Sequence, residues 1–328
     1  MKNKAVRIIL CIITGLLLTV LAVLVSFSIG EKIMFSDFYS SSERYGKIPG
    51  LWSGFVPQGY CQVEGQDLRL ACGYMSNDKS SRIYLIPNDG SNATFVEMRK
   101  ADGSAYTGHT GGITVCGDMV YVTGSTGCDI FSYADIIDGD GIAKQKTSCD
   151  TIVDPAYCSI YDGKLYVGSF YRAGNYETPE EHRMTTPAGD ENTAILAVYT
   201  VDPATGLPTS DVPERIYSTT GLVQGMALTD DGRIILSTSY GFAKSHLYVY
   251  ELARAEAESS TFTVNDVSVP LYYLDSACLV KTVEAPPMSE EIIYSDGQVY
   301  VMTESACMKY VFGKLTTGSY VYGYELDS

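Results

Sequence analysis

The stretch GKLYV at residues 163–167 is a short apolar run that begins with a glycine. Similar stretches recur as DMVYV at 118–122, GRIIL at 232–236 and GQVYV at 297–301, with a weaker copy, QDLRL, at 66–70. Each copy follows a turn and another apolar run, and a glycine or polar corner between two such runs is a β-hairpin signal. The sequence therefore predicts five related hairpins.

The strands on either side of these stretches recur as well. The runs that precede them lie at 60–63, 112–115, 157–161, 225–228 and 291–294. The runs that follow them begin with a small polar residue, continue with alternating aliphatic and aromatic residues, and lie at 81–85, 128–132, 193–197, 245–249 and 319–323. Fourth strands are expected at 94–98, 144–148, 215–218 and 271–280.

The spacing of these units predicts the fold class. The first strands, counted from Gly59, Gly112, Tyr157, Gly225 and Glu291, are 53, 45, 68 and 66 residues apart. Four-stranded units at this spacing are typical of a propeller, whereas an open sandwich leaves the repeat unexplained. We predict an all-β, five-bladed β-propeller, with six blades as the alternative, preceded by one N-terminal transmembrane helix.

The last unit has three strands before residue 328, so its fourth strand must come from elsewhere. We expect that strand upstream of Gln58, within residues 34–55. Such a ring closure covers a sheet edge that would otherwise be open to pairing with another chain.

The N-terminus predicts a membrane anchor. Lys2, Lys4 and Arg7 precede an uncharged run over residues 8–30, which is long enough to span a bilayer as a helix. Cations on its N-terminal side place Met1 in the cytoplasm and the rest of the chain outside. A cleaved signal peptide is the alternative, but its apolar region is shorter and ends in small residues at the cleavage site.

These features divide the chain into four parts. We expect a cytoplasmic tail over 1–7, a transmembrane signal-anchor over 8–30, a juxtamembrane stalk with the ring-closing strand over 31–57, and the propeller over 58–328. The protein is then a single-pass protein of the cell membrane.

Charge and cysteine content restrict the partners. Residues after the anchor carry 20 of the 23 basic and all 39 acidic side chains, a net charge of −19. This charge argues against binding to nucleic acid or to anionic lipid headgroups. Eight cysteines outside the membrane permit up to four disulfides, whose pairing the sequence leaves open. The sequence contains no CxxC motif, so a zinc site is not expected.

Propeller geometry predicts where a binding site lies. The start of each inner strand and the loop after each second strand share one face, at the mouth of the central channel. Ligands of closed β folds commonly bind at such mouths. The candidate binding residues at this face are Gln58, His109, Asp154, Arg172, Gln224, Glu290 and Glu304.

His109 and the carboxylates at the same face are candidates for catalysis or metal binding. Glu290 and Glu291 follow each other on one strand, where side chains alternate, so only one of them is expected to reach the channel. His109 with Glu290, Glu304 or Asp154 predicts either an acid/base pair or a metal site, with His109 and Glu290 as ligands of a Ca²⁺ or Mg²⁺ ion. The alternative is a structural network of polar side chains and water. His182 and His246 are expected at the solvated surface.

The segments 54–59, 108–113 and 285–291 carry a resemblance to known proteins. They resemble an uncharacterised family of exported bacterial β-propellers, over about residues 50–328. More distantly, the blades are similar to NHL and SMP-30 (gluconolactonase-like) propellers. The resemblance to the lactonases implies a divalent ion in the channel, with an acidic ligand from the first inner strand, but this chain has Gln58 there.

Two functions therefore remain open at this point. The first is a ligand-binding or interaction module whose mouth recognises a small molecule, a glycan or a surface protein. The alternative is a divalent-metal-dependent hydrolase or lactonase that uses His109 with Glu290 or Glu304. The sequence leaves open whether the protein is an enzyme.

Overall fold

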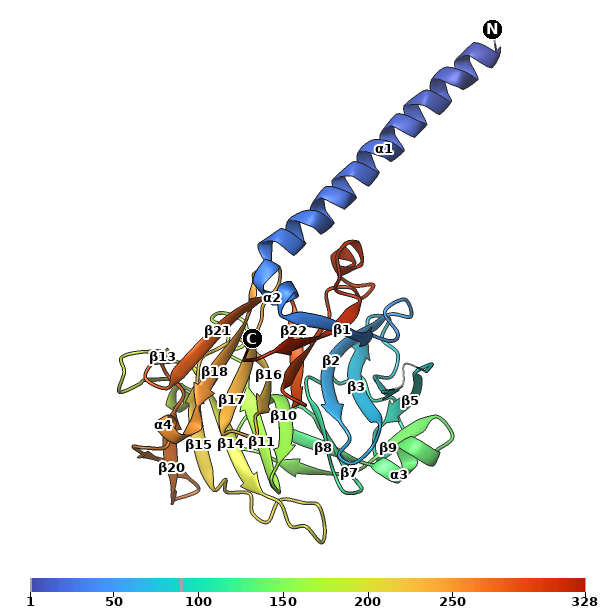
Figure 1. Ribbon diagram of the computed structural model, residues 1–328. Coiled ribbons are helices and arrows are strands. Elements are labelled where there is room, and N and C mark those ends of the chain that lie inside the picture. Colours follow the sequence, from blue (N-terminus) through green and yellow to red (C-terminus); the bar gives the residue numbers. More distant parts are fainter. Residues whose placement is uncertain (1, 89–90, 328) are drawn as a thin grey trace.

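The computed structural model describes residues 2–88 and 91–327. The chain begins with the helix α1 (Lys2–Met34), which contains the predicted apolar span and projects from a β-rich body (Figure 1). Residues Lys4–Met34 of this helix are long and apolar enough to cross a membrane. The short helix α2 (Ser36–Ser40) and the strand β1 (Ser42–Lys47) follow.

The body repeats one unit of four antiparallel strands. The innermost strands are β2 (Phe55–Gln62), β6 (Ile113–Cys116), β10 (Pro155–Tyr161), β16 (Val223–Leu228) and β22 (Ser289–Ser295). The second strands are β3 (Leu68–Met75), β7 (Met119–Thr123), β11 (Lys164–Ser169), β17 (Arg233–Thr238) and β23 (Gln298–Thr303). The third strands are β4 (Arg82–Pro87), β8 (Gly127–Ser132), β14 (Ala194–Thr200), β18 (Ser245–Glu251) and β24 (Tyr320–Glu325). The fourth strands are β5 (Thr94–Arg99), β9 (Ile142–Asp150), β15 (Arg215–Thr219) and β21 (Leu279–Ala285), with β1 in the last unit.

The units are arranged around the innermost strands, which contact one another in the order β2, β6, β10, β16, β22 and back to β2. The first two units form one eight-stranded sheet, because β5 and β9 pair in parallel. The strand β1 pairs antiparallel with β24, which confirms the ring-closing strand expected within residues 34–55. The fold is therefore mostly β and propeller-like, with one apolar N-terminal helix.

The remaining elements are short. They are α3 (Tyr133–Asp138), α4 (Leu252–Ala255), the 3₁₀ turns η1 (Glu180–His182) and η2 (Phe312–Leu315), and the strands β12 (Met184–Thr185), β13 (Glu191–Asn192), β19 (Ser260–Val264) and β20 (Val267–Tyr273).

One predicted strand, 271–280, is wrong. The structure divides this segment between β20, which pairs in parallel with β15, and β21, which is the fourth strand of the next unit. A turn at Asp275 separates the two strands: its carboxylate accepts a hydrogen bond from the Ala277 N–H, and its carbonyl accepts one from the Cys278 N–H. Aspartate commonly stabilises a turn through such local bonds.

The N-terminal segment is attached to the body by aromatic packing. Phe35 and Phe38 are buried in the core between the last two units, and Phe38 stacks on Tyr324 with ring centroids 5.6 Å apart. Burying an aromatic side chain of this kind contributes about 1.5–3 kcal/mol. The Tyr39 hydroxyl lies 2.6 Å from Thr317 Oγ1 and also bonds to the Glu31 carboxylate. The end of α1 is therefore joined to the loop between β23 and β24.

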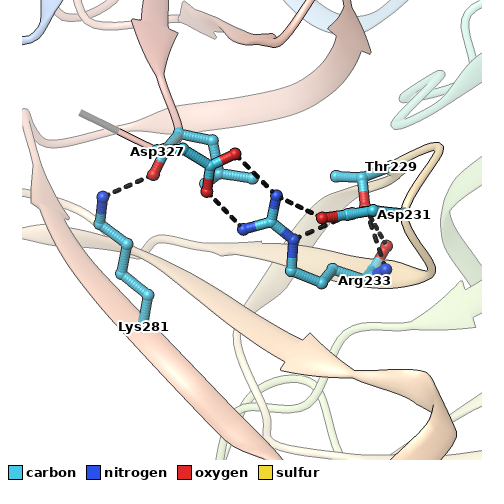
Figure 2. A network of polar contacts seen from close by, with 6 residues as sticks. Thr229, Asp231, Arg233, Lys281 and Asp327 are labelled. Atoms are coloured by element: carbon cyan, nitrogen blue, oxygen red, sulfur yellow. Dashed lines mark hydrogen bonds and ion pairs between the residues drawn. The ribbon is translucent and has the colours of Figure 1, made fainter.

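A polar network joins the last unit to its neighbour away from this loop (Figure 2). Arg233 on β17 makes two parallel bonds to the Asp327 carboxylate, of 2.7 and 2.9 Å, and it also pairs with Asp231. Lys281 on β21 donates to the Leu326 carbonyl at 2.6 Å. Bidentate Arg–carboxylate pairs are among the stronger ionic contacts, so this network holds the segment after β24 against β17 and β21.

All nine cysteines within the described residues are free thiols. Cys128 and Cys149 nevertheless lie directly opposite each other on β8 and β9.

Candidate functional site

The inner strands β2, β10, β16 and β22 each have a β-bulge near their start. The register shifts at Gln58 in β2, Ala156 in β10, Gln224 in β16, and Glu290 and Glu291 in β22. A bulge inserts a residue into one strand and redirects its side chain, and bulges are common next to functional sites. Gln58, Gln224 and Glu290, three of the predicted site residues, therefore occupy corresponding positions.

Glu291 fills the channel between the inner strands. Its Oε2 accepts hydrogen bonds from the backbone N–H groups of Tyr60 (2.8 Å) and Ile113 (2.9 Å), and its Oε1 accepts one from Cys158 (3.3 Å). These donors belong to β2, β6 and β10, so one carboxylate links three strands other than its own. Burial raises the pKa of Glu291, and the three N–H donors act in the opposite direction.

Glu290 belongs to a second cluster, together with Gln58 and Glu304. The Gln58 amide donates to Glu304 Oε2 at 2.9 Å and to the Pro57 carbonyl at 2.8 Å. Burial raises the pKa of Glu304 to about 7, while Lys309 and Gln58 act in the opposite direction. Burial, and then the charge of Glu304, raise the pKa of Glu290 well above its usual range. Two neighbouring carboxyls, Glu290 buried and Glu304 half-buried, thus compete for ionisation.

Aromatic side chains cover this carboxyl pair. Tyr74 stacks on His109 with ring centroids 4.8 Å apart, and Lys309 Nζ donates to the Tyr74 hydroxyl at 2.6 Å. Lys309 also lies over the ring of Tyr310. Burial and the Lys309 cation lower the pKa of His109, so its ring is neutral at pH 7. We call Gln58, Tyr74, His109, Glu290, Glu304 and Lys309 the mouth cluster.

An open pocket of about 190 Å³ adjoins the mouth cluster. It lies between the segment after β3 and the segment before β6, and its lining residues are Tyr74, Met75, Asp78, Lys79, Thr107 and His109. The stacked Tyr74 and His109 rings give it a neutral aromatic wall, and Asp78 and Lys79 give it charged groups of both signs. Sites for small molecules commonly combine an aromatic wall with a few polar groups in this way.

Three predicted site residues lie apart from the mouth cluster. Asp154 is exposed before β10, Arg172 lies over the Tyr240 ring at 4.0 Å, and Gln224 is half-buried in β16. Within residues 2–88 and 91–327, no hydrogen bond or ring contact joins them to the cluster. The structure thus brings together four of the seven predicted residues: Gln58, His109, Glu290 and Glu304.

The prediction for His182 is wrong. Only 4% of this residue is exposed, and its ring lies 5.9 Å from that of Phe262, because the 169–192 segment folds back through η1 onto the body.

Tyr74 and Lys309 are not among the seven predicted site residues. Tyr74 lies near the end of β3, a second strand, and the repeat predicts that the loop after each second strand lies at the mouth. Lys309 lies in the 304–319 loop between β23 and β24, whose sequence does not repeat in the other units, so its approach to Tyr74 leaves no signal in the sequence.

The predicted Ca²⁺ or Mg²⁺ site finds no support in this geometry. Among the residues that the structure describes, no group of three or more His, Cys, Asp or Glu side chains is placed to hold a metal ion. Glu304 is bonded to Gln58, and the Lys309 cation beside His109 opposes a second cation. The metal site stays a prediction, and we derive no step through it.

Glu304 makes stability depend on pH. Its pKa is raised from 4.5 to about 7, so between these values the folded protein holds a proton that the unfolded chain has released. The free energy of unfolding should therefore fall as pH rises from about 5 to about 8, by up to ~3 kcal/mol. Glu304→Gln should remove this part of the pH dependence, as measured by urea unfolding at pH 5 and pH 8. An unchanged pH dependence in the variant would contradict the raised pKa.

Comparisons with known proteins give similarity to solved structures alone. No family model and no curated protein matches the sequence. The chain is similar to a structure in a nidogen/laminin complex, with 11% identity, a TM-score of 0.43, and coverage of 76% of this chain and 73% of the other. It is also similar to the PQQ-bound aldose sugar dehydrogenase of Streptomyces coelicolor, with 15% identity, a TM-score of 0.42, and coverage of 80% and 76%.

A third similar structure is a putative oxidoreductase (glucose dehydrogenase) of Thermus thermophilus, with 12% identity, a TM-score of 0.41, and coverage of 86% and 98%. These similarities are too distant to carry an argument about activity.

Proposed function

We propose that this protein is a five-bladed β-propeller held at the outer surface of the cell membrane by α1, and that it binds a carbohydrate at the channel mouth. The blade number is supported by the five innermost strands that contact one another in a ring. The anchor is supported by the apolar helix, and a cytoplasmic N-terminus is supported by the cations before it.

The observation that carries the binding proposal is the pocket beside the mouth cluster. A sugar ring presents an apolar C–H face and a rim of hydroxyls. The neutral Tyr74–His109 wall suits the apolar face, and Asp78 and Lys79 are placed to accept from and donate to the hydroxyls. A neutral His109 keeps this wall free of a charge that would need a counter-ion.

The test is oligosaccharide binding by the full chain in lipid nanodiscs, first on a glycan array and then by calorimetry with the best ligand. Tyr74→Ala should weaken binding about tenfold or more, equivalent to about 1.4 kcal/mol, because it removes the aromatic wall. Tyr161→Ala is the matched control. Tyr161 is the last residue of β10, in the hairpin turn to β11, whereas the channel mouth lies at the start of the inner strands. Failure to bind any oligosaccharide, or equal affinity in both variants, would overturn the proposal.

A hydrolase is the second candidate, favoured by the neighbouring carboxyls of Glu290 and Glu304. A half-buried carboxyl whose pKa is raised to about 7, such as that of Glu304, suits general acid–base catalysis. The metal-dependent form predicts a higher melting temperature with Ca²⁺ or Mg²⁺ than with EDTA. An ion at 100 times its Kd would contribute about 2.7 kcal/mol. Loss of that increase in Glu290→Gln would support this candidate, and its absence in the unaltered protein would remove it.

A further inference from the structure

Exposed apolar side chains gather on three loops near the end of α1. Trp52, in the loop before β2, is 79% exposed, and Phe242, between β17 and β18, is 74% exposed. Val311, just before η2, and Leu315, at its end, are also exposed. We call Trp52, Phe242, Val311, Phe312 and Leu315 the apolar rim.

Contacts between the loops make the apolar rim one surface. The rings of Phe242 and Phe312 lie 4.9 Å apart. Lys314 lies over the Trp52 ring at 4.3 Å and donates to the Leu51 carbonyl at 3.0 Å. Contiguous exposed apolar surface is uncommon on soluble proteins and marks an interaction site.

The apolar rim lies at the level where α1 leaves the membrane in the proposed topology. Glu31 is the first charged residue after the apolar run. Its carboxylate accepts a hydrogen bond from the Tyr39 hydroxyl, which also contacts Thr317 Oγ1. Thr317 belongs to the same loop as Val311, Phe312 and Leu315. The helix also contacts η2 directly, and the loop extends toward α1 (Figure 1).

We propose that the apolar rim rests in the interfacial region of the bilayer that α1 spans, so that the channel mouth faces the membrane. This inference depends on the proposed membrane anchoring. Tryptophan favours the membrane–water interface, and the Lys314 cation beside Trp52 suits the headgroup level. The acidic body disfavours an anionic surface, so the surface that fits is a zwitterionic one.

The mouth cluster adjoins this rim. Glu304 and Lys309 belong to the same 304–319 loop as Phe312, and Lys309 contacts Tyr74 in the pocket wall. A ligand of the pocket would then arrive from the membrane surface, whereas the opposite face of the propeller would be open to the solvent.

Trp52 provides a direct probe, because it is the only tryptophan in the chain. The experiment measures Trp52 emission of the full chain in phosphatidylcholine liposomes whose acyl chains are or are not brominated. Interfacial side chains lie about 5–10 Å into the headgroup and acyl boundary. We therefore expect bromine near the headgroup to remove most of the emission, and bromine near the methyl end to remove less. Aqueous iodide should quench weakly.

Two variants test whether the whole rim is needed. Replacing Phe242 and Phe312 by serine should weaken the quenching by brominated lipid, because two of the inserted side chains are lost. Val267→Ser is the matched control: Val267 is 48% exposed on β20, away from the rim, and this change should leave the quenching as it was.

Flotation of the liposomes after an alkaline wash separates failure of the inference from failure of the anchor. Chains that do not float would refute the anchoring itself. Chains that float while Trp52 is quenched by iodide and unaffected by brominated lipid would overturn the inference alone. Trp52 protected from both quenchers would also overturn it, in favour of a rim covered by protein, such as a second copy detected by cross-linking.

Discussion

Replacing Glu291 by glutamine is expected to lower the free energy of unfolding by about 2–3 kcal/mol, in the upper part of the range of about 1–3 kcal/mol for a buried donor left unpaired. The amide oxygen can still accept from Tyr60 and Ile113, but the amide NH₂ would then face the Cys158 N–H. Glu291→Ala would leave all three donors unpaired and should be more damaging. Thermal and urea unfolding of the full chain in detergent measure the loss.

Glu290→Gln is the matched control, because Glu290 is adjacent and equally buried. Glu291 accepts three backbone hydrogen bonds, and within residues 2–88 and 91–327 Glu290 accepts none of these, so glutamine at 290 leaves no N–H donor of the inner strands unpaired. We expect a change within about 1 kcal/mol, in contrast to the loss for Glu291→Gln. Equal damage from the two substitutions would show that the Glu291 carboxylate has no special role in joining the inner strands.

The repeat could be predicted from the sequence because it is a local signal. Each hairpin is formed by residues close together in the sequence. The spacing of the five units, counted from Gly59 to Glu291, located the corresponding position in each inner strand. The strand that pairs with β24 was expected within residues 34–55, because an open edge must be covered. These predictions depended on strand alternation, turn residues and the need to pair edges, none of which requires a distant contact.

The mouth cluster could be predicted only in part, because its contacts join distant segments. Gln58 and Glu304 were both named as site residues, but their hydrogen bond spans 246 positions of the chain. Strand alternation indicated that one of Glu290 and Glu291 reaches the channel without indicating which. The bulge between Ser289 and Ile292 interrupts this alternation. As a result, the side chains of Glu290 and Glu291 are both buried.

The Gly225→Ala variant should be at least as damaging as Glu291→Gln, because the inner strands β16 and β22 approach each other at this glycine. A Cβ atom on residue 225 would lie 2.4 Å from Glu291 Cα and 2.9 Å from Ile292 N. Both neighbours are backbone atoms, so no side-chain rotation relieves the clash and the strands must separate. We expect a loss of about 3 kcal/mol or more, at or above the usual range for overpacking.

Gly46→Ala is the control for the loss of a glycine as such, since a Cβ there meets no atom within 4 Å. It should change stability by no more than about 0.5–1 kcal/mol. Native stability in Gly225→Ala would contradict the close approach of the strands. Separation of β16 from β22 would also withdraw Glu291 from its donors on β2, β6 and β10. The losses of unfolding free energy from Gly225→Ala and Glu291→Gln should therefore add to less than their sum in the double variant, because both substitutions weaken the same Glu291 hydrogen bonds.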